Sequence, residues 1–325
     1  MKTPAFWYRS HPSLLARWLA PLGWLQAAVV AARLRRHPVV SPIPVVCVGN
    51  ATAGGSGKTP AAMALEALLS EMGAQAHFVS RGYKGHAAGS LRVDPVVHDA
   101  RMVGDEPLLL SAQAPTWVGK SRVRSVLAAA LAGARCVVMD DGLQNPFVAK
   151  SLSFCVLDGA VGIGNGLCLP AGPLREPLAA ALARCHAVIL IGEDETGVLA
   201  QVPQGMPVVR ARLVPGPEVS ELRQGQWLAF CGLGRPEKFF GFLRTQGVAL
   251  AAVAPFADHH AYSGKEMAAL HAEAVRLGAG LLTTAKDMAR LSPELRVGLS
   301  VLSVRLVFEN PDQVRTLLAK GCCVS

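Results

Sequence analysis

The sequence lacks the cysteine pattern of a zinc site or of a disulfide-stabilised scaffold. None of its eight cysteines forms a C-x-x-C pair, so we do not expect a structural zinc site. Four cysteines lie inside apolar runs that are typical of strands, namely Cys47, Cys136, Cys155 and Cys231. We expect these thiols to be reduced, buried and cytosolic, where cysteine behaves as a small hydrophobic residue.

Charged and aromatic residues are also scarce, at 17% and 6% of the 325 residues, whereas 51% are hydrophobic. This composition excludes a disordered chain, and the length allows about two domains. The net charge of +9 suits nucleic acid or an anionic membrane surface, or simply a slightly basic soluble protein. No motif combines aromatic and basic residues as RNA-binding domains do, so we expect no nucleic-acid partner.

The N-terminus lacks the compact apolar core and cleavage site of a signal peptide. Residues 13–34 instead read SLLARWLAPLGWLQAAVVAARL, about 33 Å if helical throughout, which is just enough to cross a bilayer. Arg17, Pro21 and Gly23 disfavour a span, whereas the tryptophans and arginines favour the lipid–water interface. We expect residues 1–37 to form a membrane-associating helix in that interface. A single span and a buried amphipathic helix are the alternatives.

The rest of the chain predicts two α/β units. In residues 38–206, apolar strand-like runs without strict alternation take turns with helical segments, which is typical of a doubly wound parallel sheet of the P-loop NTPase type. Residues 207–221 are expected to be a linker that includes an exposed strand, VVRARLV. Residues 222–325 are expected to form a second, smaller α/β domain, with one strand over residues 299–307.

The stretch VVCVGNATAGGSGKTP resembles a phosphate-binding loop in which one glycine is missing. The pattern G-x-x-x-x-G-K-[ST] requires glycine at residue 52, which is threonine. An apolar strand precedes the loop and a helix follows it, so backbone amides and the helix N-terminus can hold phosphate oxygens. A glycine-rich turn with an incidental Lys-Thr is the alternative. The predicted nucleotide-binding residues are Thr52, Ala53, Gly54, Gly55, Ser56, Gly57, Lys58 and Thr59.

A second apolar run, CVVM, ends in Asp140-Asp141, the pattern of a carboxylate that faces Mg²⁺ in P-loop enzymes. Three further stretches, at residues 104–107, 169–176 and 256–260, supply groups that a kinase needs to accept a proton, bind metal and neutralise charge. Each has a structural alternative: Asp105 as a helix N-cap, Arg175 paired with Glu176, and His259 with its neighbour His260 as surface turn residues.

Taken together, these motifs resemble the tetraacyldisaccharide 4'-kinase (lipid A 4'-kinase) family of Gram-negative bacteria. The matching stretches run in order along nearly the whole chain: PVVCVGNATAGGSGKTP, SRGY (80–83), GDEP (104–107), VRS (123–125), DDGLQ (140–144), GNGLCLPAGPLRE (164–176), PFADHH (255–260) and TAKD (284–287). That family has threonine or serine before the glycines, so the resemblance makes the loop a family variant.

The resemblance implies transfer of the γ-phosphate of ATP to the 4'-hydroxyl of a tetraacyldisaccharide 1-phosphate in lipid A biosynthesis, with Mg²⁺. It implies that Asp105 is the general base and that His259, from the other domain, is its partner after a closing motion. The other implied roles are phosphate binding by Lys58 and Arg175, metal binding by Thr59, Asp140, Glu106 and Asp141, and substrate binding by Tyr83 and Gln144.

The chain departs from the family pattern at Asn145-Pro146, often His-Tyr in the family, and at Ala285, usually Glu. Four acyl chains would keep the acceptor in a bilayer, which implies work at the cytoplasmic face of the bacterial inner membrane. We expect the protein to act as a monomer. The main alternative is a membrane-associated P-loop switch ATPase, but Ala53 stands where such proteins carry a signature lysine. A lipid-binding protein without activity and a GTPase, for which no N-K-x-D is present, fit less well.

Overall fold

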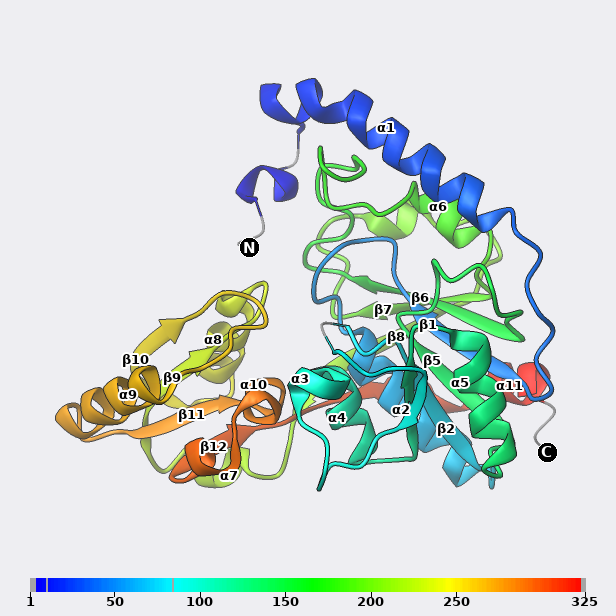
Figure 1. The fold of residues 1–325 in the computed structure, drawn as a ribbon. Coiled ribbons are helices and arrows are strands. Elements are labelled where there is room, and N and C mark those ends of the chain that lie inside the picture. The colour runs from blue at the N-terminus through cyan, green and yellow to red at the C-terminus, as the bar shows by residue number, and fades with distance from the viewer. Residues whose placement is uncertain (1–3, 10, 84, 323–325) are drawn as a thin grey trace.

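Two β-sheets organise the chain, in a computed structural model that describes residues 4–9, 11–83 and 85–322 (Figure 1). The nine-stranded sheet has the order β13-β8-β7-β6-β1-β5-β2-β4-β3, and the four-stranded sheet has the order β10-β9-β11-β12. We call the first sheet with its helices the larger unit and the second with its helices the smaller unit. The predicted α/β fold class is confirmed.

Parallel strands form the centre of the larger unit, and they are buried at every residue. They are β1 (Val45–Gly49), β2 (Ala76–Ser80), β5 (Cys136–Asp140), β6 (Leu152–Asp158) and β7 (Ala187–Ile191). Strands covered on both faces bury consecutive apolar side chains, which explains why the sequence shows no alternation here.

Helices cover both faces of this sheet, as a doubly wound fold requires. On one face, α2 (Lys58–Glu71), α4 (Asp105–Ser111) and α11 (Pro311–Cys322) pack on Val46, Phe78 and Phe154. On the other, α5 (Arg122–Leu131) packs on Val137, and α6 (Leu178–Leu182) packs on Val188.

The predicted linker over residues 207–221 is wrong in its first half. Strand β8 (Val208–Pro215) pairs in parallel with β7 and antiparallel with β13 (Val304–Phe308). Val209 and Ala211 are buried while Arg210 and Arg212 face water, so the alternation marks a strand with one covered face. The chain therefore returns to the larger unit at β13, and the predicted smaller domain of residues 222–325 ends earlier than expected.

The predicted strand over residues 299–307 is in fact two strands in different sheets. Strand β12 (Leu299–Leu302) pairs with β11 (Gly280–Thr284) in the smaller unit, and β13 pairs with β8 in the larger unit. Ser303 separates them, and its backbone N donates a hydrogen bond to the Glu218 carboxylate. One continuous stretch of chain thus connects the two sheets.

The smaller unit is a parallel sheet with a helix on each face. It is completed by β9 (Gln226–Cys231) and β10 (Ala249–Pro255), with α8 (Pro236–Thr245) and α9 (Gly264–Arg276) packed on separate apolar clusters.

The remaining elements of the described chain are η1 (Ala5–Tyr8), β3 (Ser90–Arg92), α3 (Ala100–Val103), β4 (Thr116–Gly119), η2 (Val198–Gln201), α7 (Val219–Leu222), α10 (Ala285–Arg290) and η3 (Pro293–Arg296).

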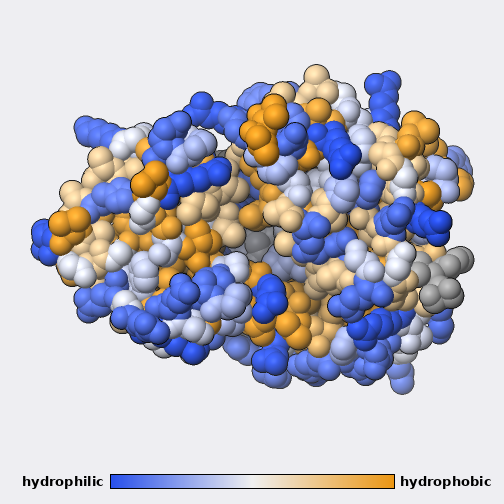
Figure 2. Space-filling view, turned by 90° about the horizontal axis from the view of Figure 1, so that it is seen from below, coloured by the Kyte–Doolittle hydropathy of each residue, from blue (hydrophilic) through white to orange (hydrophobic). Residues whose placement is uncertain are grey.

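Helix α1 (Leu14–Leu34) runs along the outside of the larger unit (Figure 1). Ser13 caps it, and Ala16 and Gly23 are buried against the unit, while Trp18 is 83% exposed. Within the described residues it is the one helix long and apolar enough to cross a membrane. On the face seen from below, by contrast, apolar residues form separate patches among hydrophilic ones (Figure 2), as surfaces in water do.

Two glycine-to-alanine substitutions test the packing at the end of β1. A Cβ on Gly49 would lie 2.9 Å from the backbone N of Leu143 and closer still to its Cβ, whereas a Cβ on Gly241 in α8 meets nothing within 4 Å. We expect Gly49→Ala to lower the free energy of unfolding by about 1–3 kcal/mol. The control Gly241→Ala should raise it by about 0.5–1 kcal/mol. Urea unfolding measures both; equal effects would contradict the packing described.

Candidate active site

The phosphate-binding loop connects β1 to α2 and adopts left-handed backbone conformations at Gly54 (φ 107°) and Gly57 (φ 83°), which glycine accepts without strain. Thr52 forms an isolated antiparallel bridge with Leu174, and its Oγ1 accepts a hydrogen bond from Asn50 Nδ2 at 2.9 Å. Extended backbone suits any residue. The loop entrance therefore has no need of the glycine that the general pattern places there.

Asp140 ends β5, next to β1, and is 1% exposed. Its Oδ2 accepts a hydrogen bond of 3.0 Å from Thr59 Oγ1, and its Oδ1 has no hydrogen-bond partner among the described residues. Burial, then the nearby charges of Glu106 and Asp141, raise the pKa of Asp140 to about 7. A buried carboxylate oxygen without a donor is costly, and a cation beside it would remove that cost.

The described residues contain no group of three or more His, Cys, Asp or Glu side chains arranged to hold a metal ion. Mg²⁺ in kinases uses one or two carboxylates, with phosphate oxygens and waters as its other ligands. Thr59 and Asp140 beside the loop fit that requirement. Among the other predicted ligands, Glu106 is ion-paired with Lys286 at 2.8 Å and Asp141 with Arg175 at 2.8 Å, so both carboxylates are already neutralised.

Arg175 reaches the loop side of Asp141 rather than pairing with Glu176, so that alternative is wrong. Its Nη1 donates to Asp141 Oδ1 and, at 3.2 Å, to Gln144 Oε1. Burial raises the pKa of Asp141, but the charges of Lys58 and Arg175 outweigh burial and hold this pKa well below its usual range. Lys58 Nζ lies 3.8 Å from Asp141 Oδ1. Two cations thus flank one carboxylate at the predicted phosphate site.

Asp105 and His259 lie in contact although 154 residues separate them. His259 Nδ1 is 3.0 Å from Asp105 Oδ2, and the ring of Tyr83 lies against the imidazole, with centroids 5.5 Å apart. His260 turns away, with its Nε2 3.0 Å from Glu266 Oε1. Asp105 is not the N-cap of α4, because Gly104 holds that position. The geometry therefore pairs Asp105 with His259, not His260.

Two cations of α10 in the smaller unit complete this cluster, and our sequence analysis missed both. Arg290 donates to Asp105 Oδ2 from Nε (2.7 Å) and Nη2 (2.5 Å), and Lys286 lies between Glu106 and Asp105. Burial raises the pKa of Asp105, but the hydrogen bond with His259 and the charges of Lys286 and Arg290 hold it well below its usual range. A Lys and an Arg four residues apart on one helix face were the available signal.

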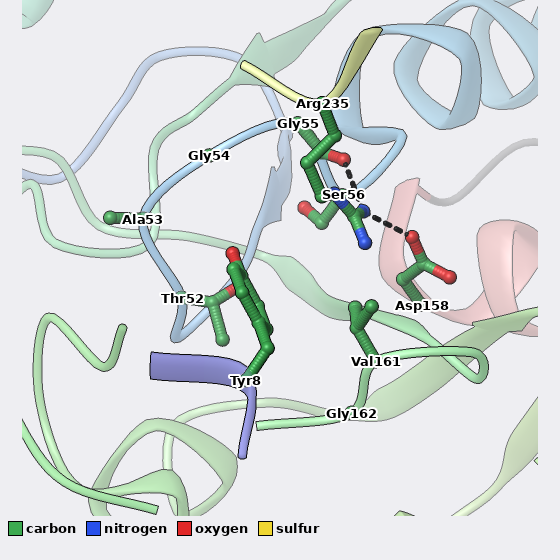
Figure 3. Close-up of a pocket in the computed structure, with 10 residues that line it drawn as sticks. All are labelled: Tyr8, Thr52, Ala53, Gly54, Gly55, Ser56, Asp158, Val161, Gly162 and Arg235. Atoms are coloured by element: carbon green, nitrogen blue, oxygen red, sulfur yellow. Dashed lines mark hydrogen bonds and ion pairs between the residues drawn. The ribbon is translucent and has the colours of Figure 1, made fainter. Parts of the chain in front are cut away.

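A third group that the sequence analysis missed lies beside the glycines of the loop (Figure 3). Arg235 Nη2 donates to Gly55 O at 3.1 Å and to Asp158 Oδ2 at 2.6 Å. Lys238 Nζ donates to the same oxygen of Asp158 at 2.6 Å. The Arg235 guanidinium also lies 5.8 Å from the centre of the Tyr8 ring. Asp158 ends β6 just as Asp140 ends β5, which was the signal for it in the sequence.

Comparison with known proteins agrees with this geometry. A sequence model of the tetraacyldisaccharide-1-P 4'-kinase family matches residues 15–322. The tetraacyldisaccharide 4'-kinase of Methylobacterium sp. (strain 4-46) is 50% identical over 324 residues, which cover 98% of this chain and 97% of that protein. The enzyme of the same name from Rhodospirillum rubrum is 49% identical over 323 residues, with the same two shares.

A solved structure shows the same fold. The crystal structure of LpxK from Aquifex aeolicus in complex with ATP superposes with a TM-score of 0.76, covering 95% of this chain and all of that one, at 24% sequence identity. Because the match covers 95% of this chain, it includes both of its sheets.

The Asp158 cluster generates a stability prediction. Burial raises the pKa of Asp158, but Lys238 and Arg235 lower this pKa below the ordinary value. The ionised carboxylate therefore stabilises the folded state. This stabilisation is complete above the unfolded-state pKa of about 4 and is lost as the pH falls through the folded-state pKa. We expect Asp158→Asn to lower the free energy of unfolding at pH 7 by about 1–3 kcal/mol.

The Asp158 difference should shrink on acidification toward pH 3, as measured by urea unfolding across a pH series. Asp312→Asn is the matched control, because its pair with Arg315 on α11 is largely exposed and contributes about 0–1 kcal/mol. An Asp158→Asn protein as stable as wild type at pH 7 would contradict the role of the ion pairs.

Proposed function

Because the chain belongs to the tetraacyldisaccharide-1-P 4'-kinase family, we propose that it transfers the γ-phosphate of ATP to the 4'-hydroxyl of a tetraacylated disaccharide 1-phosphate in lipid A biosynthesis. It is thus a phosphotransferase that acts on a hydroxyl group. The observation that carries the proposal is the contact between Asp105 and His259 beside the phosphate loop. Glu106, next to Asp105, lies near enough to Asp140 for its charge to raise the pKa of Asp140, which supports a site that the two groups of residues share.

The phosphates of ATP would lie in the loop, where the backbone amides and the N-terminus of α2 favour negative charge. The Aquifex aeolicus protein, which shares the fold, was crystallised with ATP. Lys58 and Arg175 flank Asp141 and are suited to exchange this carboxylate for phosphate oxygens. Because the transferred group carries charge on three equatorial oxygens, cations on several sides stabilise the transition state.

Thr59 Oγ1 and Asp140 would hold Mg²⁺, with Asp141 and Glu106 close by. Bound there, Mg²⁺ would supply positive charge to offset the negative charge that develops on the transferred phosphoryl group. Thr59 already points its hydroxyl at Asp140, so binding the metal would replace a hydrogen bond between the two side chains rather than require either to move far.

Asp105 would accept the proton of the acceptor hydroxyl. Its low pKa keeps it ionised at neutral pH, though it makes a weak base. A weak base suffices, because in a loose phosphoryl-transfer transition state the attacking oxygen carries little positive charge until late. His259 would orient the carboxylate through Nδ1, and the exposed ring of Tyr83 beside it would contact the sugar. The amide of Gln144 is hydrogen-bonded to Asn50, Glu176 and Arg175, so it would exchange one of these bonds for a contact with the sugar.

The acceptor's acyl chains would keep it in a bilayer, so we propose that the enzyme works at the cytoplasmic face of the inner membrane. Helix α1 supports this, since Leu14, Trp18, Trp24 and Leu25 are exposed on it and suit the lipid interface. Basic residues at both ends of the helix would face anionic headgroups.

Phosphate transfer from labelled Mg-ATP to detergent-solubilised tetraacyldisaccharide 1-phosphate tests the proposal. We expect a labelled bisphosphorylated product from wild type. Lys58→Ala and Asp105→Ala should each reduce transfer by at least about 100-fold, because each removes a group that acts in the transition state.

Lys265→Ala, an exposed lysine on α9, is the matched control and should retain full activity. Hydrolysis of ATP without any labelled lipid would refute the kinase assignment and favour a switch ATPase. Transfer that survives Asp105→Ala would retain the kinase and remove Asp105 as the base.

The pKa of Asp140, about 7, predicts that Mg²⁺ binding depends on pH. A protonated Asp140 must lose its proton before it can bind the metal, so affinity should fall as the pH drops below 7. We expect half-saturating Mg²⁺ to be about tenfold higher at pH 6 than at pH 8, measured by Mg²⁺ titration of ATP turnover. Asp140→Asn should abolish turnover at both pH values. For wild type, an equal half-saturating concentration at both pH values would contradict the prediction.

A further inference from the structure

Arg290 is a buried cation that contacts both members of the Asp105–His259 pair. Its side chain is 6% exposed. Its Nε and Nη2 donate to Asp105 Oδ2, and its Nη2 is also 3.3 Å from His259 Nδ1. We propose that Arg290 is a positioning residue that holds the Asp105 carboxylate in its reactive orientation from the smaller unit. This inference rests on the proposed kinase function.

The far side of the guanidinium is held by residues of the smaller unit. Arg290 Nη1 donates to Asp287 Oδ1 and to Gly232 O, both at 2.7 Å. Asp287 is fully buried and also accepts hydrogen bonds from Gly232 N, Tyr262 Oη and Thr284 Oγ1. Since every one of these partners belongs to the smaller unit, the guanidinium is fixed before it meets Asp105.

Gly232 connects the guanidinium to the histidine. Its carbonyl oxygen accepts from Arg290 Nη1 and, at 3.1 Å, from the backbone N of His259. His259 adopts a left-handed conformation, with φ of 57°, which is uncommon for a residue other than glycine and is supported here by its surroundings. One carbonyl oxygen therefore aligns both groups that meet Asp105.

The arrangement requires the fork of an arginine. Two of its nitrogens face Asp105 and the third faces Asp287 and Gly232, so one planar group bridges the two units. A lysine carries the same charge at a single nitrogen and cannot make both sets of contacts at once. Lys286 does not substitute for it, because its Nζ pairs with Glu106 and stays 3.9 Å from Asp105.

The consequence is that Asp105 is correctly oriented only when α10 is docked against α4. A base that is misplaced by about 1 Å can cost about 100-fold in rate, while the phosphate loop is left intact. Loss of Arg290 should therefore act on kcat rather than on the binding of ATP.

Steady-state phosphate transfer with Arg290→Gln and Arg290→Lys tests this inference. We expect Arg290→Gln to lower kcat about 100-fold, with KM for ATP within about twofold of wild type. Arg290→Lys should recover only part of kcat, about tenfold below wild type, because it restores the charge without the fork. Arg276→Gln is the matched control: this arginine is 68% exposed on α9 and pairs with Glu273, and its loss should leave kcat unchanged.

A double variant separates positioning from general destabilisation. If Arg290 acts through Asp105 and His259, Arg290→Gln combined with His259→Ala should be no more than about twofold slower than the slower single variant. Additive losses would overturn the inference, as would a kcat for Arg290→Gln within twofold of wild type or full recovery in Arg290→Lys. If Arg290→Gln does not fold, Arg290→Lys, which keeps the buried charge, decides alone.

Amide hydrogen exchange keeps the inference testable apart from the reaction. Loss of Arg290 should speed exchange over residues 104–111, which are α4 and its N-cap, in Arg290→Gln but not in Arg276→Gln. If wild type binds ATP yet transfers no phosphate, the proposed function fails and this exchange still decides whether Arg290 holds Asp105. Unchanged exchange would overturn the inference even if the kinase activity stands.

Discussion

The structure depends on how buried carboxylates of the larger unit find positive partners. A carboxylate removed from water is costly unless charges or donors replace the lost hydration. Asp105 and Asp158 meet this need with cations from the smaller unit, namely Arg290 and Lys286 for Asp105, and Arg235 and Lys238 for Asp158. The charge pattern thus docks the two units at two points, Asp105 at the start of α4 and Asp158 at the end of β6.

Asp140 is the exception, and it is the carboxylate that we propose as a metal ligand. It is as buried as the other two, yet its stabilising contacts within the described residues come from Thr59 and the charge of Lys58, both of the phosphate loop and its helix. The neighbouring carboxylates raise its pKa instead of lowering it. A carboxylate left short of positive charge inside an otherwise neutralised site is where a divalent cation with its phosphates gains most. The same electrostatic rule therefore accounts for the docking of the two units and supports the proposed Mg²⁺ site.

Local sequence signals predicted the parts of the site that lie on consecutive residues. The strand, glycine loop and helix at residues 45–71 follow from short-range patterns, and so does the carboxylate that ends β5. The resemblance supplied Asp105 and His259, but only the folded chain selects His259 over His260, since adjacent side chains point in different directions. The roles of these residues in the reaction remain predictions.

Pairings between distant residues could not be read from the sequence. Strand β8 was predicted but assigned to a linker, because nothing local indicates that its partner β13 lies about ninety residues later. Arg290 and Lys286 stand about 180 residues from the carboxylates they meet, and Arg235 likewise from Gly55. Such contacts depend on the path of the chain between the sheets, and the break at Ser303 that directs this path carries no strong signal of its own.

The arrangement of the buried Arg290 cluster is better explained by the orientation of Asp105 than by the stability of the fold. Replacing a buried ion pair with well-packed apolar residues often costs nothing, whereas removing one partner is strongly unfavourable. A cluster that joined two units for stability alone would need no arginine fork, no fully buried Asp287 behind it and no glycine carbonyl shared with His259. These features all restrict the direction in which Asp105 faces. Ion pairing here therefore links the docking of the two units to a single orientation of one carboxylate, which the proposed catalytic pair, drawn from separate units, requires.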